Sequence, residues 1–189
     1  KGRICVRTGN HDYNVALVAS LIAAHGEEKA EEIVRGVVAN FARKPQGNDR
    51  AQVKAVKEGE CDIDIGNTYY MGKMATNDEK PEEKEWAAAT AIFFPNADVR
   101  GTHVNISGAA LAKHAPHSEA GIALIEFLSG DEAQAMYAKD NFEYPIKAGV
   151  ALDSMVASWG VLKPDTVNLQ KIADLSPAAQ KLIDRVGWQ

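Results

Sequence analysis

The stretch CDIDIGNTYY, residues 61–70, places two adjacent tyrosines directly after a short predicted strand. Residues 61–67 form that strand, and the glycine and asparagine at its end are residues that commonly break regular structure. Tyr69 and Tyr70 therefore lie where a strand runs into a new segment. The chain has only five tyrosines, so the adjacent pair makes this strand end the first candidate for a functional site.

The sequence before this stretch alternates between strand and helix. Residues 3–9 predict a buried strand with a turn, and apolar spacing predicts helices over residues 14–25 and 27–40. A further helix over residues 49–58 leads into the strand at residues 61–67. This alternation predicts an α/β fold with a parallel, doubly wound sheet and helices on both of its faces.

A second tyrosine follows the other predicted strand end. In open parallel sheets, ligands bind beyond the carboxyl ends of the strands. Tyr13 comes after the strand at residues 3–9, just as Tyr69 and Tyr70 come after the strand at residues 61–67. We therefore expect Tyr13 to lie close to the tyrosine pair in space.

Three phenols at one point indicate a site for a hard, highly charged metal ion. A free phenol has a pKa of about 10, so it ionises at neutral pH only beside a strong positive charge, which a bound metal supplies. Three phenolates would neutralise one trivalent cation, and hard oxygen donors suit hard metals. An aromatic pair at a strand end is more often core packing, and that alternative stays open from the residues alone.

Composition and missing motifs exclude several classes of protein. The chain is 46% hydrophobic and 25% charged, which is typical of a globular protein, and its formal net charge of −5 argues against nucleic acid or an anionic membrane as the main partner. Its longest apolar stretches, residues 15–24 and 87–94, are too short to cross a bilayer. The sequence contains no P-loop, no zinc-ligand spacing and no nucleophile elbow.

The second half of the sequence predicts two more strands and three helices. Residues 87–95 and 102–107 are expected to be strands, and residues 118–129 and 132–140 are expected to be helices. Ser176 and Pro177 predict the start of a last helix over residues 177–186. The chain opens inside a predicted strand, so we expect it to be a fragment or a processed product of a longer chain.

Four segments are specific enough to indicate a family. They are ICVRTGNHDYN at residues 4–14, the stretch from ARKPQGNDR to GNTYYMGKM at residues 42–74, the stretch from FFPNADVRG to IEFLSG at residues 93–130, and NFEYPIK at residues 141–147. In these segments the chain resembles the periplasmic ferric-iron-binding proteins of bacterial ABC importers, in the branch whose site is rich in tyrosines.

The resemblance implies a fold and its division into lobes. It implies a type II periplasmic-binding-protein lobe with a doubly wound sheet and flanking helices. By this resemblance residues 1–99 and 151–189 form the C-terminal lobe, and residues 100–150 return to an N-terminal lobe whose main part lies before Lys1. The second lobe would then be only partly represented in this chain.

The resemblance also implies a site and a role. Tyr13, Tyr69 and Tyr70 match positions that bind Fe3+ in this branch. Independently of the resemblance, Arg7, Arg50 and His11 are candidates for neighbours of the site, because a cation near a phenolate lowers its pKa. The expected function is capture of ferric iron in the periplasm by a monomer, without catalysis, and delivery to an ABC importer permease in the inner membrane. Two alternatives remain: a protein of the same fold that binds a small organic anion, or a non-transport α/β enzyme or interaction domain.

The two cysteines give a further expectation. From the residues alone, Cys5 and Cys61 are either two buried thiols or one disulfide. They begin strands that we expect to be neighbours, and the periplasm implied by the resemblance is oxidising. We therefore expect a disulfide with a Cα–Cα distance of about 5.5–6 Å.

Overall fold

Two short parallel strands lie at the centre of the first half of the chain. The computed structural model describes residues 2–189. Strand β1 (Ile4–Cys5) pairs in parallel with β2 (Ile63–Asp64), with Ile4 opposite Ile63. On its other side, Ile4 forms a parallel bridge to Phe41. The predicted parallel pairing of these two segments is confirmed, although the strands are shorter than the sequence indicated.

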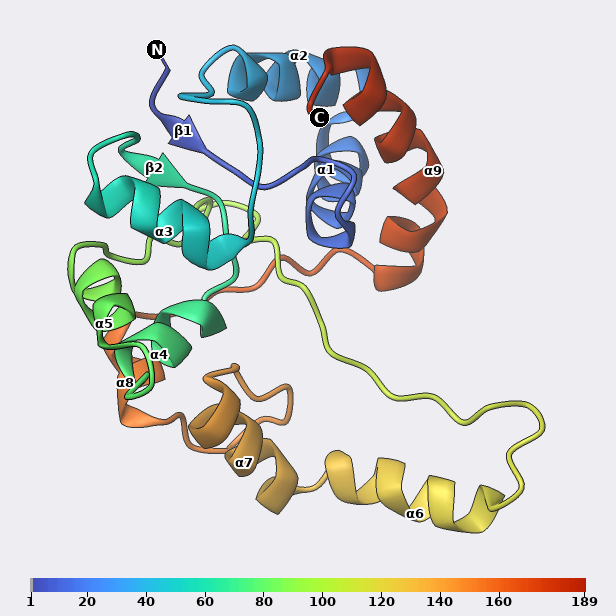
Figure 1. Ribbon diagram of the computed structural model, residues 1–189. Coiled ribbons are helices and arrows are strands. Elements are labelled where there is room, and N and C mark those ends of the chain that lie inside the picture. The colour runs from blue at the N-terminus through green and yellow to red at the C-terminus, as the bar shows by residue number, and fades with distance from the viewer. Residues whose placement is uncertain (1) are drawn as a thin grey trace.

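Alternation along the first strand divides the apolar side chains between two faces. Val6 is buried in the larger core, whereas Cys5 points to the opposite face, where it packs near Ala55. The larger core joins three helices, and Figure 1 shows them together on one side of the strands: α1 (Asp12–His25), α2 (Glu27–Val38) and α9 (Leu169–Val186). Helix α3 (Asp49–Lys57) covers the other side.

Cys5 and Cys61 form a disulfide between the two strand segments. Their Cα atoms are 5.9 Å apart, which confirms the expected pairing. Among residues 2–189 there is no other cysteine. The disulfide ties the segment that leads to Tyr13 to the segment that leads to Tyr69.

Two short helices pack below α3, and the first of them carries the tyrosine pair. Helix α4 (Tyr69–Ala75) follows β2, and α5 (Pro81–Ala88) contains the second half of the charged run at residues 77–85. Val53, Met74 and Ala87 form a small core between α3, α4 and α5. Gly72 of α4 lies directly under the ring of Phe142, where an added Cβ would stand 2.2 Å from the ring. Only glycine fits this contact, which joins α4 to the end of α7.

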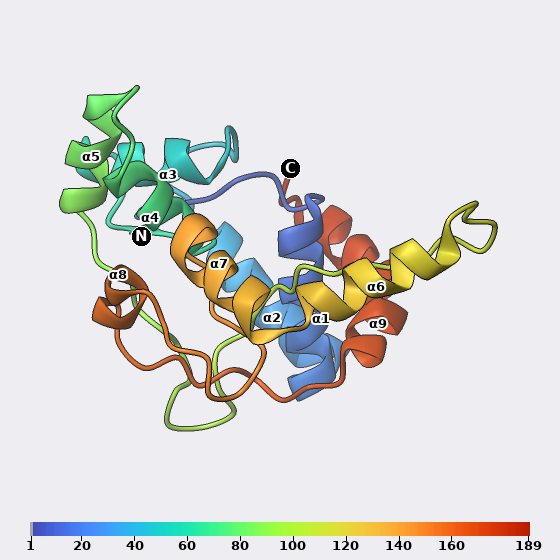
Figure 2. The same ribbon diagram turned by 90° about the horizontal axis from the view of Figure 1, so that it is seen from below.

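The middle of the chain is more extended. Residues 103–117 run without helix or strand to α6 (Ser118–Leu128). Helix α6 stands away from the main body in Figure 1, whereas in the view from below it passes in front of α1 and α9 (Figure 2). Helix α7 (Asp131–Asn141) follows it, and α8 (Ser154–Ser158) lies nearer to α4 and α5. Helix α6 buries none of its residues. In the part of the chain that the structure describes, no helix is both long and apolar enough to cross a membrane.

The two strands predicted in the second half do not form. Ala87 and Ala88 belong to the end of α5, and residues 89–95 are irregular, with the side chain of Phe93 84% exposed. In residues 102–107 only Thr102 pairs, through a single bridge to Pro164. Apolar and β-branched residues favour a strand only where a neighbouring strand completes the hydrogen-bonded ladder. Within residues 2–189 these segments have no such neighbour.

The last helix begins well before the predicted start. Asn168 caps α9 by accepting a hydrogen bond from the N–H of Gln170, and Pro177 lies inside the helix. Ser176 does not cap, since its hydroxyl donates to the Ile172 carbonyl. A proline within a helix removes one backbone hydrogen bond. The helix continues because its apolar face, which includes Ile172 and Leu182, is buried in the core.

Candidate metal centre

The structure brings tyrosines from two distant segments together. The hydroxyl oxygens of Tyr13 and Tyr69 are 3.2 Å apart, although the residues are separated by 56 positions in the sequence. Tyr13 lies in the first turn of α1, and Tyr69 and Tyr70 begin α4. The rings of Tyr69 and Tyr70 lie side by side, with their centroids 4.3 Å apart. The expected approach of Tyr13 to the tyrosine pair is therefore present in the fold.

A tight turn held by the C-terminal segment positions Tyr13. Gly9 donates its N–H to the carbonyl of Trp188 at 3.2 Å, and the indole Nε1 of Trp188 donates to the carbonyl of Arg7 at 3.1 Å. A Cβ at position 9 would lie 2.6 Å from the Trp188 carbonyl, so only glycine fits here. His11 then caps α1, with its Nδ1 accepting from the N–H of Tyr13 at 3.3 Å. The turn and the cap together fix where Tyr13 enters the site.

Each of the three phenol rings has one cationic side chain over it. The distance to the ring centroid is 5.4 Å from Arg7 to Tyr13, 5.1 Å from Lys73 to Tyr69, and 5.2 Å from Arg50 to Tyr70. A cation over an aromatic face attracts the ring, and a nearby positive charge also favours an ionised phenol. The three cations therefore lower the cost of forming several phenolates at one place.

Without a metal ion, Tyr69 is strongly disposed to keep its proton. Burial raises the pKa of Tyr69 well above the ordinary value for tyrosine, and the neighbouring phenols of Tyr13 and Tyr70 raise it further. Desolvation penalises the charged form, and two phenolates side by side repel each other. Only a strong positive charge placed among the three hydroxyls could reverse this preference.

The three neighbours suggested by the sequence have different roles. The Arg7 guanidinium forms an ion pair with Asp49 at 2.8 Å, and Arg50 Nε lies 3.3 Å from a carboxylate oxygen of Glu83 without hydrogen-bond alignment. His11 is a helix cap whose ring packs edge-on against Tyr13. Arg7 and Arg50 thus lie over phenol rings while their charge is shared with a carboxylate.

Two neighbours of the site were missed from the sequence. Lys73 lies one helical turn after Tyr69 on α4, and spacing of four residues would have indicated this contact if residues 69–75 had been assigned to a helix. Asp49 is fully buried beside Arg7. It stands at the start of a predicted helix, and no signal in the sequence marked it as a neighbour of the site.

Phenols are the candidate metal ligands that the fold gathers here. Among residues 2–189, no three side chains from the set of histidine, cysteine, aspartate and glutamate form a cluster that could hold a metal ion. Tyr13 lies in the wall of a cavity of about 470 Å³, together with Asp12 and His103. Burial lowers the pKa of His103, so its imidazole is predisposed to stay neutral there.

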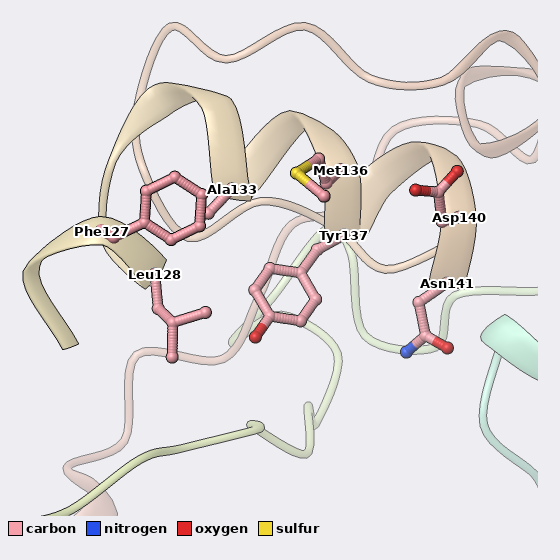
Figure 3. Close-up of a pocket in the computed structure, with 7 residues that line it drawn as sticks. All are labelled: Phe127, Leu128, Ala133, Met136, Tyr137, Asp140 and Asn141. Carbon is pink, nitrogen blue, oxygen red and sulfur yellow. The ribbon is translucent and has the colours of Figure 1, made fainter. Parts of the chain in front are cut away.

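A second cavity lies at the far end of the extended region. It has a volume of about 360 Å³ and is enclosed by the end of α6 and one side of α7. Figure 3 shows the side chains on its walls, with Phe127 and Leu128 from α6 and Met136 and Tyr137 from α7. None of Tyr13, Tyr69 and Tyr70 lines this cavity. It is a mostly apolar hollow, separate from the tyrosine cluster.

Known proteins resemble this chain over its whole length. Iron uptake protein A1 of Synechocystis sp. is 47% identical over 189 residues, which is all of this chain and 52% of that protein. Ferric iron-binding protein A of Mannheimia haemolytica, solved in an open conformation, is 49% identical with a TM-score of 0.94, and the match covers all of this chain and 58% of that one. FutA of Trichodesmium, solved with iron and citrate, is 44% identical with a TM-score of 0.95, and 60% of it is covered.

These similarities establish the fold and show how much of its relatives' length this chain covers. The structural neighbours have the type II periplasmic-binding-protein fold, so the expected fold class is confirmed. The chain spans about half the length of the curated relatives that it matches. The family model for bacterial extracellular solute-binding proteins matches residues 1–164. The chain therefore belongs to the family of bacterial extracellular solute-binding proteins.

Proposed function

We propose that this chain binds ferric iron through the phenolate oxygens of Tyr13, Tyr69 and Tyr70. The observation that carries the proposal is the 3.2 Å approach of the Tyr13 and Tyr69 hydroxyls, which come from separate parts of the sequence. Two neutral phenols gain little from such an arrangement beyond one hydrogen bond. A trivalent cation among three phenolates gains full charge compensation, with oxygen donors of the hardness that it prefers.

The surroundings of the site support a highly charged metal over an organic anion. An anion would need free cationic groups, but the Arg7 guanidinium is already paired with Asp49, and Arg50 lies beside Glu83. The arginines and Lys73 instead lie over the phenol rings. That arrangement helps the phenols to ionise, which is a requirement of metal binding and not of anion binding.

The role proposed for the whole protein is capture and delivery, without catalysis. Relatives named for iron uptake and for ferric iron binding support ferric iron as the cargo. The family to which the chain belongs consists of extracellular solute-binding proteins. We place the protein in the periplasm as a monomer that hands iron to the permease of an ABC importer in the inner membrane. The Cys5–Cys61 disulfide agrees with an oxidising compartment.

The division into lobes is part of the same proposal. Residues 1–99 and 151–189 would form one lobe, and residues 100–150 would belong to a second lobe that closes over the metal. The exposed apolar side chains of α6, among them Ile122, Leu124 and Phe127, support this division. A soluble protein seldom leaves so many apolar side chains of one helix in water unless another surface covers them.

Visible absorption tests the proposal directly. Ferric phenolate is coloured, whereas a protein that binds an organic anion is not. We expect the purified chain to develop a visible band when a weak ferric chelate is added. The variants Tyr13→Phe, Tyr69→Phe and Tyr70→Phe should each show a weaker band. Each should also release iron to citrate at least about tenfold faster, which corresponds to a loss of about 1.4 kcal/mol or more in binding free energy.

The matched control is Tyr137→Phe on α7. This tyrosine also lines a cavity, but none of Tyr13, Tyr69 and Tyr70 lines that cavity, so its variant should bind iron as the wild-type chain does. Absence of any band in the wild-type chain would refute iron binding through phenolates. Equal losses in Tyr137→Phe and Tyr69→Phe would refute the assignment of the site.

A further inference from the structure

Asp49 is a fully buried carboxylate whose partners all belong to the two segments that carry the tyrosines. Its side chain is 2% exposed. One carboxylate oxygen accepts from Arg7 Nη1 at 2.8 Å. The other accepts from the backbone N–H of Asn67 at 2.9 Å and from the Asn67 side-chain amide at 3.0 Å. Asp49 thus joins the segment before Tyr13 to the segment before Tyr69.

The partners of Asp49 also contact the site. Arg7 places its guanidinium over the ring of Tyr13. Asn67 directly precedes the turn into α4, and its carbonyl accepts from the N–H of Tyr70 at 3.3 Å. Each of the two segments that carry the tyrosines is therefore linked to the Asp49 carboxylate through one residue, Arg7 or Asn67.

A carboxylate is the side chain that this position requires. Its oxygens only accept hydrogen bonds, so the three donors that face it are all satisfied. The amide nitrogen of Asn67 must then point at Asp49, and its oxygen turns outward to accept from Asn105 Nδ2 at 3.0 Å. An asparagine at position 49 would turn an NH2 group toward at least one of these donors and would leave it without a partner.

We propose that Asp49 is the positioning residue of the site, which holds the Tyr13 and Tyr69 segments at a fixed separation before any metal binds. Ligands that are already in place lose less conformational freedom when the ion arrives, so preorganisation strengthens binding without a further contact to the ion. The effect on iron rests on the proposed function. The fixed separation of the two segments does not depend on it.

Two variants and one control separate positioning from general stability. Asp49→Asn removes the charge and one acceptor without changing the size of the side chain. Asn67→Ala removes only the link to the second segment. Gln52→Met is the control: Gln52 is buried on the same helix and bonds to the Gln46 and Asn48 carbonyls, so its loss weakens the fold without touching either tyrosine segment.

The first measurement is amide hydrogen exchange in the metal-free chain. Asp49→Asn should speed exchange in residues 7–14 and in residues 66–71, by about tenfold for the loss of a charge-assisted bond. Asn67→Ala should speed it in residues 66–71 alone. If Asp49→Asn accelerates these segments no more than Gln52→Met does, positioning by Asp49 is refuted. If Asp49→Asn fails to fold, Asn67→Ala decides, and unchanged exchange in residues 66–71 refutes the proposal.

The second measurement is chelator-driven iron release. Asp49→Asn should release iron about ten- to a hundredfold faster than the wild-type chain, and Gln52→Met should match the wild type when both are fully folded. Faster exchange with unchanged iron release would overturn the role of Asp49 in metal binding. If the wild-type chain binds no iron, the proposed function fails, whereas the exchange experiment still decides whether Asp49 holds the two segments.

Discussion

Helix α6 is the more apolar of the two helices α6 and α9, yet it is the one that lies in solvent. Helix α9 buries Leu182, Ile183 and other side chains against α1 and α2. Helix α6 buries none, and Leu124 on it is 56% exposed. The contrast shows that an apolar pattern predicts a helix but does not supply the surface that covers it. The tyrosine cluster is built entirely on the packed region, which comprises α1–α5 and α9.

The largest difference between the packed region and the α6–α7 region should be the pH dependence of iron binding, which we expect only at the tyrosine cluster. The pKa of Tyr69 is raised in the metal-free chain, so this phenol keeps its proton at neutral pH and must lose it to bind the metal. Affinity should therefore rise with pH, by up to about a thousandfold per pH unit if three protons are released. Titration of the visible band toward acid, corrected for the chelator, measures this slope.

Tyr137 on α7 provides the comparison for that titration. Its replacement by phenylalanine should leave the slope unchanged, because it is not part of the cluster. A band that keeps its intensity on acidification would contradict phenolate binding in the packed region.

The second effect is the loss of the Cys5–Cys61 disulfide, which closes a loop of more than fifty residues in the packed region. A disulfide across such a loop stabilises by about 4 kcal/mol, chiefly by restricting the unfolded chain. Denaturation of the double Cys5→Ala, Cys61→Ala variant should show a loss of about 2–5 kcal/mol in the free energy of unfolding. Exchange rates in α6 should change little, and a large change there would show that the two regions unfold as one unit.

A matched pair of leucines measures the contrast between the helices themselves. Leu182→Ala removes a fully buried side chain from α9 and should cost about 2–5 kcal/mol. Leu124→Ala on α6 should change stability by less than about 0.5 kcal/mol, because that side chain is already largely in water. Thermal denaturation of both variants tests this, and equal costs would mean that α6 is covered in solution.

The smallest effect concerns Asp64 on β2. Burial, together with the charge of Asp49, raises the pKa of Asp64 to about 6, well above the ordinary range for an aspartate. The folded state then holds this proton more tightly than the unfolded state, so stability falls as pH rises between about 4 and 6. Asp64→Asn cannot ionise and should be more stable than wild type at pH 7.5 by about 1–3 kcal/mol.

The advantage of Asp64→Asn should disappear near pH 4, where the wild-type carboxyl is protonated in the folded state. Urea denaturation at both values of pH provides the measurement. An equal advantage at pH 4 and at pH 7.5 would show that the buried charge of Asp64 is not its cause.

The tyrosine cluster could be anticipated from the sequence because it depends on strand ends. Parallel strands bring their carboxyl ends to one edge, so Tyr13 and Tyr69 could be paired without knowledge of any long-range contact. The disulfide followed from the same reasoning, since Cys5 and Cys61 begin adjacent strands. The type II fold came from the resemblance in the tyrosine motifs, and the structural neighbours confirm it.

Other features depended on tertiary contacts that no local pattern records. Residues 87–95 have the composition of a strand but no neighbouring strand within residues 2–189. Pro177 suggested a helix start, yet burial of the apolar face of α9 outweighs the lost hydrogen bond. Asp49 was overlooked because its importance comes from Arg7 and Asn67, which lie far from it in the sequence. The roles of Tyr13, Tyr69 and Tyr70 as ligands stay a prediction until metal binding is measured.

The contact between Trp188 and the turn at Gly9 has a consequence for biosynthesis. The Trp188 indole reaches back 181 residues to the carbonyl of Arg7. A ribosome delivers the N-terminal segment first, so the turn before Tyr13 stays without this support until residue 188 has been released. Contacts between residues so distant in sequence also form late in folding, because a long loop must close first. The tyrosine cluster should therefore be completed only after residue 188 has left the ribosome, late in the folding of this chain.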